Sequence, residues 1–161
     1  MLALSRLKEV LDYDPETGKF YWKVKTANRT VIGAEAGCRA SIGYIRICID
    51  GKFYYAHSLA LYYVNGVYPP SCVDHINHVR DDNRVVNLRY ATYKQNGGNR
   101  TPTSILGVSG VSWMKDRNKW YVEIGHNDKQ HYIGTFSCLG QAVKARKAAE
   151  KKYYGEYAYK G

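Results

Sequence analysis

The side chains best suited to chemistry lie in residues 72–99, which hold an Asp-His pair and two later Asn residues: Asp74, His75, Asn87 and Asn96. Hydrolysis of a phosphodiester needs a base for the attacking water, and a neutral imidazole such as that of His75 serves near pH 7. It also needs a Lewis acid for the developing charge, and Mg²⁺ held by one carboxylate, one amide oxygen and waters meets that need. The stretch therefore predicts metal-assisted phosphodiester hydrolysis.

The order of these residues limits how they can act together. On a regular strand, Asp74 and His75 would point to opposite faces. At a strand end the chain can turn, so that Asp74 binds the cation while His75 faces the water. Asn96 would supply the amide oxygen, and Asn87 could bond to the His75 ring or backbone and fix its tautomer. Taken singly, Asn87 is an ordinary turn residue and Asn96 an ordinary helix cap, so the spacing of the whole set carries the prediction.

Hydrophobic periodicity and turn residues predict the elements that hold these side chains. The Asp50-Gly51 dipeptide predicts a two-residue hairpin turn, and Thr92 with Gln95 forms a capping box that starts a helix. The expected order is a helix around 4–11, strands at 19–23, 44–49 and 52–56, a helix at 57–64, strands at 72–74 and 87–91 separated by a charged loop, and a helix from 92.

The pattern changes after a polar stretch that contains Pro102. We expect a first domain at 1–100, a linker at 101–106 and a second domain at 107–161. The second domain reads as three strands, 107–114, 119–124 and 130–136, followed by a helix over 137–154. The fold class is therefore α+β, with a three-stranded antiparallel sheet packed on one helix in the second half. Within it, alternation turns Trp120, Val122 and Ile124 towards the helix and leaves the opposite sheet face exposed.

The first half resembles the HNH endonucleases of phages and mobile introns, over about residues 2–100. The resemblance is carried by Asp-His-Ile-Asn at 74–77, Asp-Asn-Arg at 82–84, Asn-Leu-Arg at 87–89 and Gln-Asn at 95–96. It implies a ββα-metal core with one divalent ion, Mg²⁺ or Mn²⁺, with His75 as general base and Asp74 and Asn96 as ligands. The chain departs from the family at His78-Val79, where Gly-Asp is usual, and at Ser58, where Arg is usual.

Residues 107–158 resemble the plant ethylene-response-factor type of DNA-binding domain, through Gly110-Val111, Lys119-Trp120, Glu123-Ile124 and residues 132–136. That family lays its sheet in the major groove of duplex DNA. The family's Arg residues are absent at Ser109, Ser112 and Gly125, so we expect weaker base specificity or a different target. The DNA-binding residues that we predict over both halves are Arg84, Arg89, Lys94, Trp113, Lys115, Arg117, Tyr121, Glu123, Lys129, Gln130 and Tyr132.

The overall composition agrees with a polyanionic partner. Lys and Arg number 24 against 14 Asp and Glu, a net charge of +10, and such a field favours nucleic acid. No long apolar run suggests a membrane partner. The four cysteines form no Cys-x-x-Cys pair, so we expect reduced, mostly buried thiols in a cytoplasmic protein.

The leading hypothesis is a monomeric DNA endonuclease, encoded by a phage or an intron and acting in the cytoplasm of a bacterial host cell. A single site of this kind should nick one strand of double-stranded DNA. One alternative is a DNA-binding regulator whose nuclease core is inactive. Another is a defence or packaging nuclease with little sequence preference.

Overall fold

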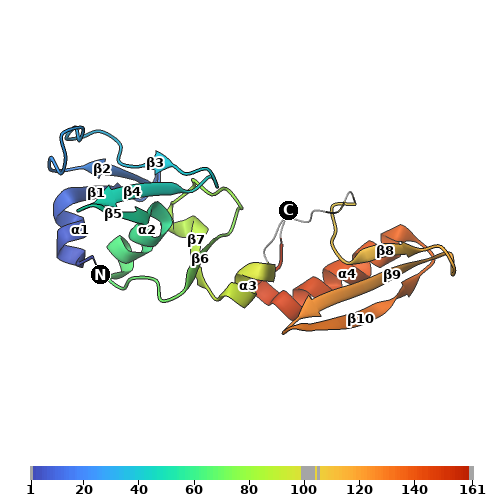
Figure 1. The fold of residues 1–161 in the computed structure, drawn as a ribbon. Helices are drawn as coiled ribbons and strands as arrows, with labels where there is room; N and C mark the ends of the chain where they lie inside the picture. Colours follow the sequence, from blue (N-terminus) through green and yellow to red (C-terminus); the bar gives the residue numbers. More distant parts are fainter. Residues whose placement is uncertain (1, 99–103, 105, 160–161) are drawn as a thin grey trace. The chain divides into compact units, whose positions relative to one another are not determined.

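The computed structural model describes residues 2–98, 104 and 106–159, which form a mixed α and β protein, as expected (Figure 1). Its strand pairs are antiparallel, and the chain divides into two compact units, Met1–Thr92 and Tyr93–Gly161. This division falls before the linker expected at 101–106, of which the structure describes only residues 104 and 106. The domain limits at 100 and 107 therefore stay predictions.

The first unit consists of three small antiparallel sheets and two helices (Figure 1). In chain order its elements are α1 (Leu4–Val10), β1 (Leu11–Asp14), β2 (Lys19–Trp22), β3 (Cys38–Arg39), β4 (Ile45–Ile49), β5 (Lys52–Tyr55), α2 (Ala56–Asn65), β6 (Cys72–His75), the 3-10 helix η1 (Val85–Asn87) and β7 (Leu88–Ala91). The sheets are β1–β2, β3–β4–β5 and β6–β7. The Asp50-Gly51 turn has positive φ at both residues, as the hairpin prediction requires.

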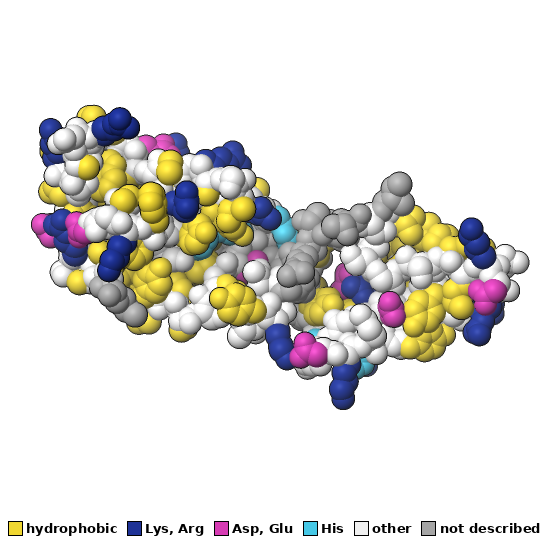
Figure 2. Space-filling model, viewed as in Figure 1, with side chains coloured by type: hydrophobic (Ala, Val, Ile, Leu, Met, Phe, Trp, Pro, Cys, Tyr) yellow, Lys and Arg dark blue, Asp and Glu magenta, His cyan; other side chains and the backbone are white. Residues whose placement is uncertain are grey.

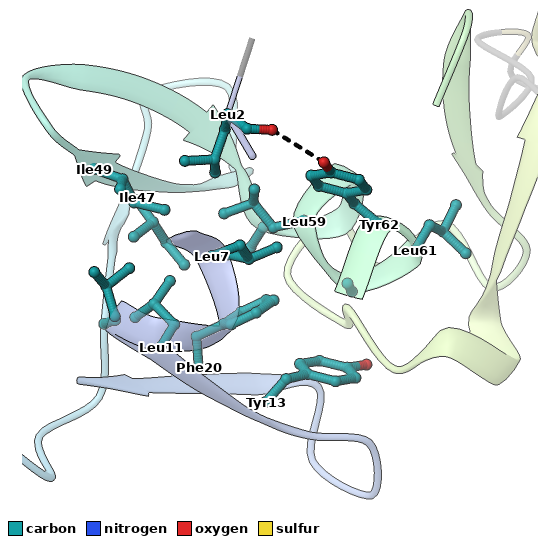
Figure 3. Packing of buried hydrophobic residues seen from close by; sticks show 14 of the residues in the cluster. Leu2, Leu7, Leu11, Tyr13, Phe20, Ile47, Ile49, Leu59, Leu61 and Tyr62 are labelled. Atoms are coloured by element: carbon teal, nitrogen blue, oxygen red, sulfur yellow. Dashed lines mark hydrogen bonds between the residues drawn. The ribbon is translucent and has the colours of Figure 1, made fainter. Parts of the chain in front are cut away.

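One hydrophobic core joins α1, the β1–β2 hairpin, β4 and α2 (Figure 3). Leu7, Phe20 and Leu59 are fully buried there, together with Ile47 and Ile49 of β4. Burial of such apolar side chains is the main force that holds these short elements together. The core thus supports α2, which carries His57, and β4, which follows Tyr44. Both of these rings contact the site described below.

The second unit is a three-stranded antiparallel sheet against one long helix (Figure 1). Its elements are α3 (Tyr93–Gly98), β8 (Val111–Met114), β9 (Lys119–His126), β10 (Lys129–Phe136), α4 (Leu139–Tyr154) and the 3-10 helix η2 (Gly155–Tyr157). Val122 and Ile124 are fully buried, and Ala142 of α4 lies in the same core as Val122. The pairing of β9 with β10 shifts by one residue between Tyr132 and Gly134, so Ile133 forms a bulge.

Two expectations about the sequence need correction. The strand expected at 107–114 begins only at Val111, because Gly107 and Gly110 have φ of 65° and 70°, outside the range of a strand. The cysteines, expected to be mostly buried, are free, but three of them are exposed and Cys72 is half-buried. In the described part of the chain, none of the helices combines the length and apolar character that crossing a bilayer demands.

Candidate active site

The β6–β7 hairpin holds the Asp-His pair in the first unit. Asp74 pairs with Arg89 across the hairpin, and His75, the last residue of β6, pairs with Leu88. After His75 the chain turns at once, since the backbone N–H of His78 donates to the His75 carbonyl at 3.1 Å. Both Asp74 and His75 are only 5% exposed. His75 therefore lies at the end of its strand, where the turning chain lets Asp74 and His75 face the same site.

Arg89 holds the Asp74 carboxylate from the neighbouring strand. Its Nε and Nη2 atoms lie 2.8 and 2.7 Å from Asp74 Oδ2, with side-chain exposures of 16% and 5% for the two residues. Breaking a buried pair by removing one partner is strongly destabilising, since it leaves an uncompensated charge. Arg89, predicted as a DNA contact, therefore fixes the orientation of the carboxylate in this structure.

Two aromatic rings contact the imidazole of His75, and a third ring stacks on one of them. The ring centres of Tyr44 and His57 lie 5.6 and 5.2 Å from that of His75, and Tyr55 stacks on His57 at 5.2 Å. Burial in this setting lowers the pKa of His75, while the hydrogen bond to Asn83 Oδ1 raises it. The His75 ring is therefore neutral at pH 7, the form in which it can accept a proton.

His57 is a second buried imidazole whose place the sequence did not reveal. The Nδ1 atom of His57 is buried without a hydrogen-bond partner. Burial, and then the charge of His75, lower the pKa of His57 to about 3. His57 is thus a neutral ring that packs against His75 in the wall of the site.

The loop after His75 is fastened by Asn87, although by different bonds from those expected. The Asn87 side chain accepts from the backbone N–H of Asn77 at 3.0 Å and donates to the carbonyl of Asp82 at 2.9 Å. The ring of His75 instead has its Nε2 atom 3.4 Å from Oδ1 of Asn83. Asn87 therefore shapes the loop, and Asn83, which is in the Asp-Asn-Arg motif but was not singled out, reaches the imidazole.

The β1–β2 hairpin packs against this loop and fixes the position of Asn83. The hydroxyl of Tyr13 donates to the Asn83 carbonyl at 2.8 Å. At Gly18, where φ is 72°, a Cβ atom would collide with the backbone of Asn83 and Arg84. Glycine is therefore required for this close approach. The hairpin and the loop together place Asn83 beside the His75 ring.

Arg84, Lys94 and Asn96 are the other predicted residues of the HNH-like segment. Arg84 is exposed and forms an ion pair of 2.6 Å with Asp82, which lowers the pKa of Asp82 to about 2. Lys94 and Asn96 are in α3 of the second unit, where Lys94 pairs with Asp128 at 2.9 Å and Asn96 is half-buried.

The predicted DNA-binding face of the second unit is assembled by the sheet. Tyr132 is 60% exposed and stacks on Tyr121 with ring centres 5.4 Å apart. Glu123 pairs with Tyr132 across β9–β10, and Gln130 is exposed on the same strand. Figure 2 shows hydrophobic side chains gathered on the visible surface of this unit, with Lys and Arg at its end. The remaining predicted residues, Trp113, Lys115, Arg117 and Lys129, are all exposed.

The oxygen ligands at hand suit a hard cation. Among residues 2–98, 104 and 106–159, no three His, Cys, Asp or Glu side chains come together as a metal-binding group. A carboxylate such as Asp74 with an amide oxygen and waters is the ligand set that Mg²⁺ accepts, so the donors fit this ion better than Zn²⁺. Arg89 bonds to Oδ2 of that carboxylate.

Known proteins resemble this site and its surroundings. A family model described as HNH endonuclease matches residues 54–97, which include Asp74, His75, Asn87 and Asn96. Protein 3.8 of Escherichia phage T7 is 31% identical over 88 residues, which cover 53% of this chain and 72% of that protein. The chain therefore belongs to the HNH endonuclease family.

A solved structure is also similar to part of the chain. It concerns DNA binding and cleavage by the HNH homing endonuclease I-HmuI, with 27% identity and a TM-score of 0.44. The matched part covers 55% of this chain and 50% of that one, so the present chain spans half the length of the solved protein.

Proposed function

We propose that this protein is a metal-dependent DNA endonuclease that hydrolyses one phosphodiester bond per engagement and so nicks duplex DNA as a monomer. The observation that carries the proposal is the buried, neutral His75 beside the Asp74 carboxylate at the end of β6. The similarity to a phage protein supports an origin in a phage or intron and action inside a bacterial host cell.

In this proposal His75 is the general base. Because Asn83 Oδ1 accepts a hydrogen bond from the His75 ring, Nε2 carries the proton and Nδ1 has the lone pair that removes a proton from water. The rings of Tyr44 and His57 restrict the rotation of the imidazole. Asn87 contributes by keeping the loop in shape.

We assign Asp74 and Asn96 as the protein ligands of one divalent ion, Mg²⁺ or Mn²⁺. When bound, such an ion supplies Lewis-acid stabilisation to the phosphate and the leaving oxygen. Arg89 keeps the Asp74 carboxylate in a fixed direction and offsets part of its charge. Arg84 and Lys94 are assigned to phosphate groups of the same DNA.

The second unit is assigned to targeting, as an ethylene-response-factor-type DNA-binding domain. The stacked pair of Tyr121 and Tyr132 supports this assignment, because it presents aromatic surface on the outer face of a sheet. A two-stranded or three-stranded sheet face fits the major groove. Glu123 pairs with Tyr132, and Gln130 and Lys129 lie earlier on the same strand as Tyr132. Trp113, Lys115 and Arg117 lie at or beside the β8–β9 turn.

The test is cleavage of supercoiled plasmid DNA with Mg²⁺, with Mn²⁺ and with a chelator. The proposal expects conversion to the nicked circle with either metal and none with the chelator. Asp74→Asn should need a higher metal concentration for half-maximal cleavage, because the variant replaces a charged ligand with a neutral one. A wild type that cleaves nothing with either metal, or cleaves equally with the chelator, overturns the proposal.

A further inference from the structure

A cationic groove lies beside the site in the first unit. The loop that follows β3 and the loop that follows β6 form the walls of a cavity of about 550 Å³. We call it the arginine groove; its lining residues are Arg39, Ala40, Ser41, Ile42, Gly43, His78, Val79, Arg80 and Asp81. None of them is among the residues assigned above to catalysis, metal or DNA.

Arg80 is fixed in this groove and joins it to the site. Its Nη1 atom donates to the carbonyl of Ile42 at 2.7 Å, and its guanidinium lies over the ring of Tyr44 at 5.4 Å. The same Tyr44 ring contacts the ring of His75. A single aromatic ring therefore separates the guanidinium of Arg80 from the proposed general base.

Arg39 provides a second guanidinium on the opposite wall. Its Nη2 atom lies 3.4 Å from Asp81 Oδ2, and the Arg39 side chain is mostly exposed. An exposed pair at that distance is weak, so an anion in the groove can compete with Asp81. The held guanidinium of Arg80 and the exposed guanidinium of Arg39 are suited to phosphate, because each offers several donors in one plane.

The backbone of His78 in the groove wall has a left-handed conformation. His78 has φ of 63°, a region in which glycine is favoured and other residues are strained. His78 is three residues after the proposed base, in the turn that His78 N–H closes on the His75 carbonyl, and it lines the groove. Strain of this kind gathers at functional sites.

The rim of the groove indicates which phosphate fits. Ile42 and Val79 are about half exposed there, next to the charged groups. A sugar–phosphate backbone alternates apolar sugar with charged phosphate, so it matches this wall better than a free phosphate ion does. We infer that the arginine groove binds a backbone phosphate of the DNA strand that is cut, close to the bond that His75 attacks. This inference rests on the proposed function.

The test measures binding without cleavage. A labelled random-sequence duplex of about 30 base pairs is titrated with the full-length protein in the presence of a chelator, at salt concentrations from roughly 50 to 200 mM. Log affinity falls as log salt rises, and each lost phosphate contact makes this slope shallower by about 0.9. We expect this decrease for Arg80→Gln and for Arg39→Gln, and about twice as much for the double variant.

Two matched variants make the result decisive. Arg29→Gln removes one charge from an exposed residue between β2 and β3, outside the groove, and should leave the slope unchanged. Asp81→Asn removes the carboxylate that faces Arg39 and should strengthen binding. Arg39→Gln is informative even if Arg80→Gln unfolds the protein, because Arg39 is mostly exposed and holds no loop carbonyl.

Three results contradict the groove. The first is a wild-type salt slope in the folded Arg39→Gln and Arg80→Gln variants. The second is a decrease of the slope in Arg29→Gln as large as in these variants. The third is displacement of the DNA by inorganic phosphate beyond that caused by a salt of matched ionic strength. The last would show a site for free phosphate. Failure of the proposed function is a separate observation, because it requires a wild type that binds DNA in this assay yet cleaves none when metal is added.

Discussion

Asn83 Oδ1 lies 3.4 Å from Nε2 of His75, and this contact defines which nitrogen of the imidazole carries the proton. The orientation of the Asn83 amide is set by its other end, where Nδ2 donates to the Asp81 carbonyl at 3.1 Å. Because Oδ1 can only accept, Nε2 must donate in this contact, and the lone pair of the neutral ring is on Nδ1.

Replacing Asn83 by Leu should therefore reduce kcat by roughly 10-fold to 100-fold, the range known for residues that orient a metal-bound His. DNA affinity should change little. The measurement is single-turnover nicking together with ¹⁵N shifts of the His75 ring, which report its tautomer. Asn83→Asp keeps the acceptor and should recover part of the rate. Equal losses in both variants would show that Asn83 only supports the loop.

Gly18 should be needed for activity as well as for stability. In Gly18→Ala the new methyl group meets the backbone of Asn83 and Arg84, so the loop must move away from His75. Gly51→Ala is a matched control, because its φ of 77° is similar and no atom lies within 4 Å of the added Cβ. Both variants should lose about 1–2 kcal/mol from the left-handed conformation. Only Gly18→Ala should also lose nicking activity, and a fully active Gly18→Ala contradicts the account.

The stability of the first unit should decrease in acid because of His57. The pKa of His57 is lowered from 6.5 in the unfolded chain to about 3 in the folded one, so below pH 6.5 the unfolded state binds a proton that the folded state excludes. Stability from this group is complete above pH 6.5 and is lost as the pH falls towards 3, by roughly 1.4 kcal/mol per pH unit.

His57→Phe removes this titration while keeping a ring against Tyr55. Urea unfolding at several pH values between 4 and 7 should therefore give a smaller loss of stability in the variant than in the wild type. Identical pH dependence in the two proteins would mean that His57 is not excluded from protonation in the folded state.

The strands that carry the site could be predicted from sequence patterns. The contacts of Arg89 and Asn83 could not, for physical reasons. The β6–β7 hairpin and the position of His75 at a strand end agree with the expected strands. The pairing of Arg89 with Asp74 depends on the hairpin register, which the loop length alone did not give. Asn83 depends on how the loop closes over the β1–β2 hairpin, and no local pattern encodes that long-range contact.

The surface exposure of Cys48 was, by contrast, readable. Ile47 and Ile49 are buried on one face of β4, so the residue between them must face outward. The alternation of β4 therefore outweighs the general tendency of cysteine to be buried. The bulge at Ile133 had no such signal, because it depends on how β9 and β10 pair.

Tyr132→Ala should weaken binding and blur the positions of cleavage, with no change in metal dependence. The variant removes an exposed ring that stacks on Tyr121, and loss of a central aromatic contact typically weakens binding by about 10-fold or more. The measurement combines cut-site mapping with affinity. Gln141→Ala, at an exposed position of α4, is the control. Cleavage at unchanged positions with unchanged affinity would remove the targeting role from this face.

The central claim, that His75 is the general base, is tested most directly by the nicking rate of His75→Ala with Mg²⁺, measured beside its DNA affinity. Removal of a general base lowers the rate by about 10²–10⁴-fold. The account predicts a loss of that size with a DNA affinity close to that of the wild type. The buried ring of His75 acts in the chemical step, and its removal takes away no contact with the DNA backbone. A folded His75→Ala variant that nicks at nearly the wild-type rate would contradict it.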